Sequence, residues 1–362
     1  MFGTGYIFWR GGDGIREEFG ALGTREGVGF MAEATIRDVA REAQLSVASV
    51  SRALNGHKSV RPETRARIVA VADRLGYVPH AGARSLSMAR SNAIGVVLPD
   101  LHGEFFSEIV RGMDREATRL GLQLLLSNMH ADPVQAGQAL RAMHGRVDGL
   151  LIMCPQMRTE GWVGSMPRGI PAVLLNTPEP MMDHPSMAID NRAGAAAIAR
   201  HLIDLGRRHI VHIAGPDHNI DARERREGFE DAVRKLAPDA TVTVLSGDFN
   251  EDTGEDAANI ILKENMKVDA IFAANDMMAV GCLQALRAAG KRVPEDIAIA
   301  GFDDVPIARY LALTTARVNI ADIGARAVIR LTQIMNGGEG ANEGVEVHEP
   351  ELVIRGTTVT TH

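Results

Sequence analysis

The stretch from Thr35 to Asn55, TIRDVAREAQLSVASVSRALN, constrains the fold more than any other part of the chain. Apolar residues recur at helical spacing in its first half and again in its second half, with very few residues between the two. Ser46 is placed to cap the second segment, because a serine oxygen there accepts a bond from a free backbone N–H. The pattern predicts two short helices joined by a tight turn. A solvent-exposed helical hairpin with an ordinary charged face would show the same pattern.

A third predicted helix favours a DNA-binding helix-turn-helix over the plain hairpin. It starts with Pro62 at a first helical position and stops at Gly76, so three helices can close a small core. The second helix would then enter the major groove, where Arg52 can donate two bonds to a guanine edge. The candidate DNA-contacting residues on and beside this helix are Ser46, Val47, Ala48, Ser49, Arg52 and Asn55.

The segments DVAREA, SVASVSRALNG, PETRARI, LGYVP and ARSL follow one another as in the lactose/galactose repressor (LacI/GalR) family of bacterial transcriptional regulators, which the chain resembles from residue 34 to about 358. The resemblance implies a DNA-binding domain over 34–78 and a hinge helix and linker over 79–91. It also implies that Val47, Ala48 and Arg52 set base preference, and that Leu86 wedges into the minor groove. Gln44 departs from the family pattern, which usually has glycine there, and Arg61 stands where a helix cap is usually serine.

Charge is distributed unevenly along the chain. Residues 32–90 carry ten Lys and Arg against five Asp and Glu, whereas residues 91–362 carry 26 against 37. A basic domain suits a phosphate backbone, and the acidic remainder discourages indiscriminate DNA contact. The two cysteines, Cys154 and Cys282, are far apart and lack metal-ligand spacing, which favours two reduced buried thiols in the cytoplasm.

Residues 1–33 are crowded with glycine and show no helical or strand periodicity, which predicts a disordered extension. Their apolar run, Tyr6 to Trp9, is too short for a signal peptide or a membrane span, so no membrane partner is expected. Two interpretations stay open: the chain starts at Met31 after an over-long translation, or the extension is genuine.

From residue 92 onward, short apolar runs alternate with amphipathic helices, which predicts the α/β class with parallel sheets covered on both faces. The runs cover 93–98, 122–127, 149–153, 172–175, 210–214, 242–245, 270–273 and 297–300. Their number suggests two doubly wound subdomains, like a periplasmic sugar-binding protein. The resemblance adds crossovers near 190, 319 and 342. The expected N-subdomain is thus about 92–189 and 320–342, and the C-subdomain about 190–319 and 343–362.

Polar residues follow several predicted strands, and ligands of open parallel sheets bind beyond the carboxyl ends of the strands. These residues are Asp100, Asn176, Asp217, Asn275 and Asp303. Each one taken alone is better explained as a helix cap, but five at corresponding strand ends favour a binding site. Phe105 and Phe106 offer aromatic faces for a sugar ring, although core packing also explains such a pair. The resemblance places effector contacts at Phe105, Phe106, Arg225, Asn275 and Asp303, and we expect Asp100 and Asn176 to contribute.

The sequence lacks the motifs of an enzyme: no glycine-rich phosphate loop follows a strand, and no zinc-spaced histidine pair or nucleophile elbow occurs. No catalytic residue, metal or cofactor is expected. The expected protein is a homodimeric or higher-order regulator, most simply a repressor of carbohydrate-metabolism genes, which a small sugar-like effector releases from a palindromic DNA operator. The alternatives are a corepressor in place of an inducer, a sugar-processing enzyme and an exported sugar-binding protein.

Overall fold

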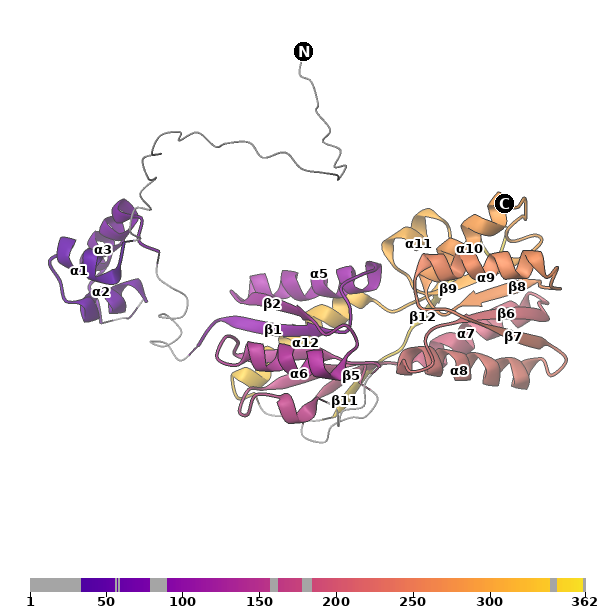
Figure 1. The fold of residues 1–362 in the computed structure, drawn as a ribbon, viewed down its shortest axis with the longest axis horizontal. Helices are drawn as coiled ribbons and strands as arrows, with labels where there is room; N and C mark the ends of the chain where they lie inside the picture. Colours follow the sequence, from indigo (N-terminus) through magenta and orange to yellow (C-terminus); the bar gives the residue numbers. More distant parts are fainter. Residues whose placement is uncertain are drawn as a thin grey trace, which may run out of the picture. The chain divides into compact units, whose positions relative to one another are not determined.

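A computed structural model describes residues 34–55, 57, 59–78, 90–156, 162–177, 184–338 and 344–360. The chain divides into two compact units, a head that ends at His80 and a core that begins at Ala81 (Figure 1). Each unit is described by itself. The expected extension over 1–33 and the hinge residue Leu86 lie outside the described residues.

The head consists of three helices: α1 (Ile36–Glu42), α2 (Val47–Leu54) and α3 (Pro62–Leu75). Their inner faces form a small apolar core of Val39, Ala40, Ala43, Val50, Ala53, Ile68, Val71 and Ala72. The Ser46 hydroxyl caps α2 by accepting a bond from the Ser49 N–H at 3.2 Å. Gly76 ends α3 with a φ of 63° in the left-handed region.

Two unfavourable positions in the head coincide with the departures from the family pattern. Gln44, in the turn between α1 and α2, has a φ of 52°. Left-handed backbone of this kind costs a residue with a side chain roughly 1 kcal/mol. Arg61 is the N-cap of α3, and its side chain makes no capping hydrogen bond. The head is therefore less stable with Gln44 and Arg61 than it would be with glycine and serine at these positions.

The first sheet of the core has the strand order β11-β5-β4-β3-β1-β2, and every neighbouring pair is parallel. Its strands are β1 (Ala93–Leu98), β2 (Gln123–Asn128), β3 (Gly149–Met153), β4 (Ala172–Leu175), β5 (Ser186–Ile189) and β11 (Val345–His348). Helices α5 (Glu104–Arg119) and α12 (Ile320–Met335) cover one face, and α6 (Pro133–Met143) covers the other (Figure 1). A short 3-10 helix, Val163–Ser165, packs beside α6.

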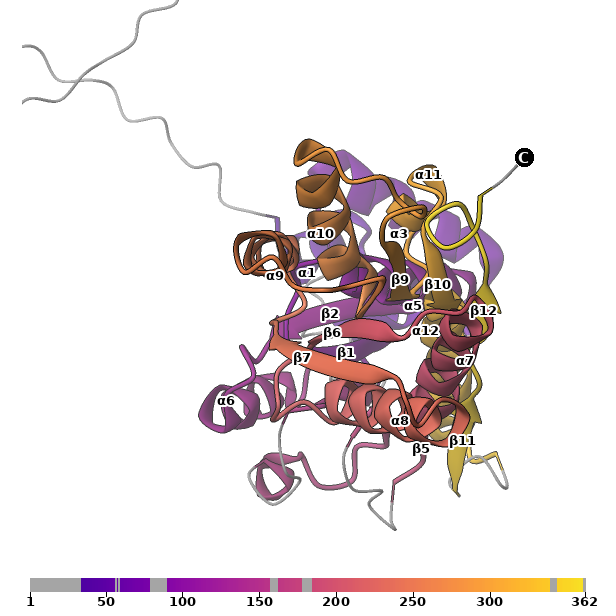
Figure 2. The same cartoon turned by 90° about the vertical axis from the view of Figure 1, so that its right-hand side faces the viewer.

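The second sheet repeats this plan with the order β12-β10-β9-β8-β6-β7. Its strands are β6 (His209–Ala214), β7 (Thr241–Ser246), β8 (Ala270–Ala273), β9 (Ala298–Asp303), β10 (Thr314–Arg317) and β12 (Glu351–Val353). All pairs are parallel except β10 with β12. Helices α7 (Asn191–Asp204) and α8 (Ile220–Leu236) lie on one face, with α9 (Glu251–Lys263) and α10 (Asp276–Ala288) on the other (Figure 2). The short α11 (Pro306–Tyr310) follows β9.

Glycines let paired helices approach to backbone contact. A Cβ on Gly281 of α10 would lie 1.9 Å from the Glu251 carbonyl oxygen of α9, and one on Gly254 would lie 2.0 Å from that of Met278. Gly112 of α5 meets the Ala321 carbonyl oxygen of α12 in the same way, at 1.8 Å. Each subdomain therefore has one pair of helices that can pack this closely only because glycine lies at the contact.

All eight predicted strands are present, so the prediction of two parallel α/β subdomains is confirmed. The sequence did not indicate β5, β10, β11 and β12. One expectation is wrong: the third crossover does not occur near residue 342. It follows β11, because Val345–His348 pairs with β5 in the first sheet before the chain reaches β12 in the second.

Candidate functional site

A cavity of about 160 Å³ lies between the two subdomains of the core, at the carboxyl ends of their strands. From the first subdomain its walls are Asp100, His102, Gly103, Glu104, Phe105, Phe106, Met153, Pro155 and Gln156. The second subdomain supplies Pro216, Asn219, Asp221, Arg225, Asp248, Phe249, Asn250, Glu251, Asn275, Met277, Asp303 and Val305. Any molecule held in this cavity would therefore touch both subdomains.

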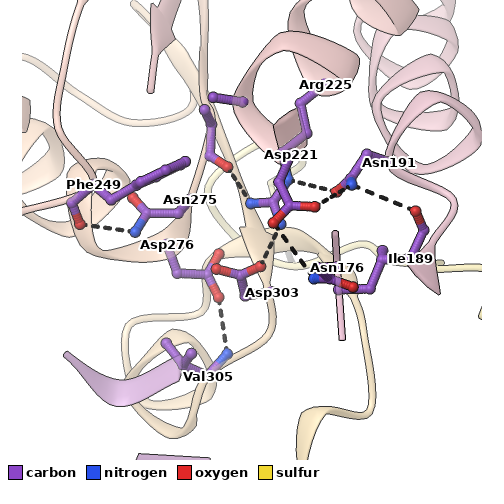
Figure 3. A network of polar contacts seen from close by, with 12 residues as sticks. Asn176, Ile189, Asn191, Asp221, Arg225, Phe249, Asn275, Asp276, Asp303 and Val305 are labelled. Atoms are coloured by element: carbon purple, nitrogen blue, oxygen red, sulfur yellow. Dashed lines mark hydrogen bonds and ion pairs between the residues drawn. The ribbon is translucent and has the colours of Figure 1, made fainter. Parts of the chain in front are cut away.

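Arg225 is the central cation of the site, and it is 3% exposed. Its Nε donates to Asn191 Oδ1 at 2.9 Å, and its Nη1 donates to the Ala274 carbonyl oxygen at 2.6 Å. Its Nη2 lies 3.1 Å from Asp303 Oδ1, and the guanidinium stacks 3.9 Å from the centre of the Phe302 ring. Figure 3 shows Arg225 of α8 together with Asn191 of α7 and Asp303 at the end of β9. The buried guanidinium thus has protein partners before any ligand arrives.

Two buried carboxyl groups, Asp303 and Asp221, interact with this one guanidinium, and a third, Asp276, lies close to Asp303. Burial raises the pKa of Asp303 to about 6, although Arg225 acts in the opposite direction. Burial also raises the pKa of Asp221. Asp276 lies behind the cavity wall, where its carboxylate accepts bonds from the Val305 N–H at 2.9 Å and the Thr315 hydroxyl at 2.6 Å. Its pKa is raised well above the ordinary value by burial and by neighbouring Asp303. Carboxyl groups therefore outnumber cationic groups here, and burial favours the neutral form of each.

Asn275 and Asp100 line the cavity, yet both also hold local structure. Asn275 caps α10: its Oδ1 accepts from the Met278 N–H at 3.0 Å, and its Nδ2 donates to the Phe249 carbonyl at 2.8 Å (Figure 3). Asp100 Oδ1 accepts from the N–H groups of Leu101 and His102 in its own loop. Asn275 is therefore both a helix cap and a cavity residue, whereas Asp100 lines the cavity without capping α5, whose N-cap is Gly103.

Two polar residues expected at the strand ends do not line the cavity. Asn176 is buried and donates to Asp221 Oδ2 at 3.4 Å, so it reaches the site only through that carboxylate. Asp217 is exposed and stands outside the cavity wall. Phe105 and Phe106 both line the cavity as a half-buried, edge-to-face pair with centroids 5.5 Å apart.

The sequence did not predict several of the residues that line the cavity, among them Gln156, Asn219, Asp221, Asp248, Phe249, Glu251 and Met277. Asp248 and Phe249 follow β7, and Gln156 follows β3, so the rule on strand ends would have found them. Asn219 and Asp221 lie at the start of α8 and have the composition of an ordinary helix N-terminus. No sequence signal separates these two from a cap.

Hydrogen bonds join the two subdomains beside the cavity. The Ile220 N–H at the start of α8 donates to the Pro155 carbonyl oxygen at 3.0 Å. The Ile307 N–H of α11 donates to Glu104 Oε2 of α5 at 3.3 Å, and Asn176 bonds Asp221 as noted above. The orientation of the subdomains is thus held by groups that border the ligand space.

In the head, α2 presents an outward face that matches the residues expected to contact DNA. Val47, Ala48 and Arg52 are exposed, whereas Ser49 and Asn55 are half-buried. Ser46 is also exposed, but its hydroxyl is engaged in the α2 cap. The Arg52 Nε donates to the Ala48 carbonyl at 3.2 Å, so the side chain lies along its own helix. The side chains on this face are small near the start of α2, and Arg52 adds a positive charge one turn later.

Within the described part of the chain, no group of three or more His, Cys, Asp or Glu side chains could hold a metal ion. The same residues include no helix that is long and apolar enough to span a bilayer.

Comparison with known proteins identifies the family of the chain. Residues 35–80 match the family described as bacterial regulatory proteins, lacI family, and residues 199–358 match a periplasmic binding protein-like domain. Catabolite control protein A from Priestia megaterium is 34% identical over 308 residues, which cover 83% of this chain and 92% of that protein. This chain belongs to the lacI family of bacterial regulatory proteins.

Other members of the lacI family are similar over comparable lengths. The HTH-type transcriptional repressor PurR of Haemophilus influenzae is 33% identical over 332 residues, covering 89% of this chain and 98% of that protein. The ribose operon repressor of Halalkalibacterium halodurans is 33% identical over 300 residues, covering 80% and 87%. A crystal structure of the lac repressor dimer bound to operator and the anti-inducer ONPF has a TM-score of 0.80 at 28% identity, covering 90% of this chain and 99% of that one. The expected family and fold class are confirmed.

Proposed function

We propose that this lacI-family protein represses carbohydrate-metabolism genes from a palindromic operator, and that a small sugar-like effector releases it. The observation that carries the proposal is a cavity walled by both subdomains in a chain that also has a helix-turn-helix head. The relatives support a sugar: one is named a ribose operon repressor, and a complex of CelR with cellobiose has a TM-score of 0.64 at 29% identity.

The DNA-reading surface in this proposal is the outward face of α2. Val47 and Ala48 approach the bases, Arg52 swings from its own helix to a guanine edge, and Ser46, Ser49 and Asn55 lie beside them. Leu86, outside the described residues, supplies the minor-groove wedge that the resemblance implies. One head offers too few contacts for specific binding, so two heads of a homodimer read two half-sites. The lac repressor dimer on its operator is a structural precedent.

Effector and DNA are coupled through the orientation of the subdomains. A ligand that touches Phe105 and Phe106 on one side and Arg225, Asn275 and Asp303 on the other changes how the two sides close. Linkage requires each ligand to change the affinity of the other by the same factor, typically 1–3 kcal/mol for coupled sites. The protein binds and releases its effector unchanged, without turnover, and it works in the cytoplasm where its DNA lies.

Selection of bound sequences from random duplex DNA tests the first half of the proposal. A palindrome should emerge, and Arg52→Ala should cost about 1–3 kcal/mol at one base position with little change in the salt dependence. Arg234→Ala is the matched control, because this exposed arginine of α8 pairs with a neighbour on its own helix and should leave operator affinity unchanged. Equal loss on operator and random DNA would instead make Arg52 a phosphate contact.

Titration of sugars against the operator complex tests the second half. An inducer should weaken operator binding, and Phe106→Ala should reduce that response by removing an aromatic wall of the cavity. A ligand that strengthens operator binding would make the protein a corepressor-dependent repressor. A protein that binds sugar without any effect on DNA would contradict the proposed coupling.

A further inference from the structure

The charges around the cavity are strongly unbalanced. Six carboxylates line it: Asp100, Glu104, Asp221, Asp248, Glu251 and Asp303. Arg225 is the single Lys or Arg among the lining residues that the structure describes. The carboxylates come from both subdomains, so no orientation of a bound molecule avoids them. A ligand with its own negative charge would be repelled from several directions.

Arg225 offsets only part of this excess, and three of its five N–H donors already face acceptors of the protein. Its three nitrogens are directed at Asn191, at the carbonyl oxygen of Ala274 and at Asp303. A phosphate or carboxylate group is held most strongly where cationic donors are free to form paired bonds with it. Here an anion beside Arg225 would compete with Asp303 for the guanidinium and would lie close to that carboxylate.

Most of the charged side chains of the wall are hydrogen-bond acceptors. Asn275 uses both polar atoms of its side chain within the protein, as described above. In contrast, Gln156 Oε1 is buried and accepts no hydrogen bond from the described residues, and Asp303 Oδ1 has Arg225 at 3.1 Å as its one polar partner among them. Asp303 is 5% exposed and lines the cavity. Buried acceptors of this kind are costly unless a ligand supplies N–H or O–H groups.

The aromatic lining adds a surface that attracts cations. Phe105, Phe106 and Phe249 all line the cavity, and the face of an aromatic ring carries partial negative charge. A protonated amine within about 6 Å of such a ring is stabilised, and the C–H faces of a sugar ring pack on the same surface. The wall therefore complements a ligand that has hydrogen-bond donors, a positive charge and an apolar ring face.

We propose that the effector is a small polyhydroxylated amine, such as an amino sugar, and that the cavity rejects phosphorylated and carboxylated sugars. The inference rests on the proposed function, since it specifies the chemistry of the ligand in the same cavity. Hydroxyl groups and the ammonium supply the missing donors, and the ammonium compensates carboxylates that Arg225 leaves without a counter-ion. Burial raises the pKa of Asp221 and Asp303, and the neighbouring Asp221 adds to the effect on Asp303.

Matched ligand series test the proposal by calorimetry on the full chain. Each series compares a parent hexose with its 2-amino, 2-acetamido and 6-phosphate forms, in the glucose, galactose and mannose configurations. In the configuration that binds, the amine should bind at least tenfold more tightly than the parent. The acetamido form, which keeps the nitrogen but not the charge, should lose that advantage, and the phosphate should show no binding.

A pair of variants on α9 separates pocket charge from overall charge. Glu251→Gln removes a lining carboxylate and should weaken the amine about fivefold more than the parent, the upper range for an exposed ion pair. Glu255→Gln removes the same charge one turn along the helix, away from the cavity, and should leave both affinities unchanged. Equal effects of the two variants would mean that long-range charge alone favours the amine, and would overturn a specific role for the cavity wall.

The proposal is also overturned if a parent sugar or a phosphate binds as tightly as the amine, or if no amine binds in any series. Measuring operator affinity with each ligand distinguishes this failure from failure of the proposed function. A neutral sugar that releases the operator would leave the proposed function intact and refute the amine. An amine that binds without changing operator affinity would support the ligand chemistry and refute the coupling.

Discussion

Replacement of Arg225 by methionine should destabilise the core far more than a binding-site substitution normally does. The change keeps an apolar stem beside Phe302 but removes the guanidinium that Asn191, the Ala274 carbonyl and Asp303 share. Removing one member of a buried ion pair leaves the other charge uncompensated, at a cost of about 3–5 kcal/mol. We expect a loss in this range at pH 7, measured by urea unfolding followed by circular dichroism.

The loss should also depend on pH. Arg225 lowers the pKa of Asp303, so its removal raises the pKa of that carboxyl above the value of about 6 in the intact protein. A carboxyl whose pKa is higher in the folded than in the unfolded chain destabilises the folded state increasingly as pH rises above the unfolded value. Protonation relieves this penalty, so Arg225→Met should cost less at pH 5 than at pH 7.

Two further variants make the prediction refutable. Arg225→Met combined with Asp303→Asn should recover at least about 1 kcal/mol relative to Arg225→Met, because one uncompensated charge is gone. Arg226→Met is the control: this neighbouring side chain is 41% exposed and pairs with Glu230, so its loss should stay below about 1 kcal/mol. A cost below about 1 kcal/mol for Arg225→Met, or the same cost at both pH values, would refute the reasoning.

Three other substitutions test the head, a helix pair and a buried histidine. Arg61→Ser should supply the missing cap of α3 and raise the stability of the head by about 1 kcal/mol, read from amide hydrogen exchange; no change would mean that the cap is satisfied by water. Gly281→Ala should cost about 2 kcal/mol or more in urea unfolding, because its Cβ would meet the α9 backbone; a stabilised variant would show that the helices separate freely. Burial lowers the pKa of His212 to about 4, so the unfolded chain binds a proton that the folded chain excludes, and stability falls as pH drops from 6.5. Between pH 7 and pH 5, the free energy of unfolding of His212→Phe should therefore fall by about 2 kcal/mol less than that of the wild type. Parallel pH profiles of the two proteins would contradict the lowered pKa of His212.

The sequence predicted those parts of the fold in which one short segment carries the whole signal. The eight apolar strands, the Ser46 cap and the stop at Gly76 each depend on residues close in the chain. The four strands that were missed are short and lie toward one side of each sheet. The β11 segment Val345–His348 alternates exposed and half-buried residues, so its composition resembles a loop until its partner β5 is known.

The sequence predicted which strand ends form the candidate site, but not which side chains bond one another within it. The rule on strand ends correctly brought Asp303 and Asn275 to one cavity. It could not show that Arg225 is held by Asp303 rather than free, because the two residues come from different elements of the second subdomain. For the same reason Asn176, which follows a strand as the rule requires, was expected in the wall but contacts Asp221 behind it.

The path of the chain between the two sheets also bears on how the protein folds during its synthesis. The first sheet is completed by β11 at Val345–His348, after the whole of β6 to β10 has been made. Strands β1 to β5 therefore leave the ribosome first, yet their sheet must wait for α12 to cover one face and for β11 to pair with β5. Until then that apolar face and the β5 edge are exposed, a condition that favours aggregation and chaperone binding. Translation interrupted anywhere before His348 would leave both sheets incomplete, including the one whose first strands were made earliest.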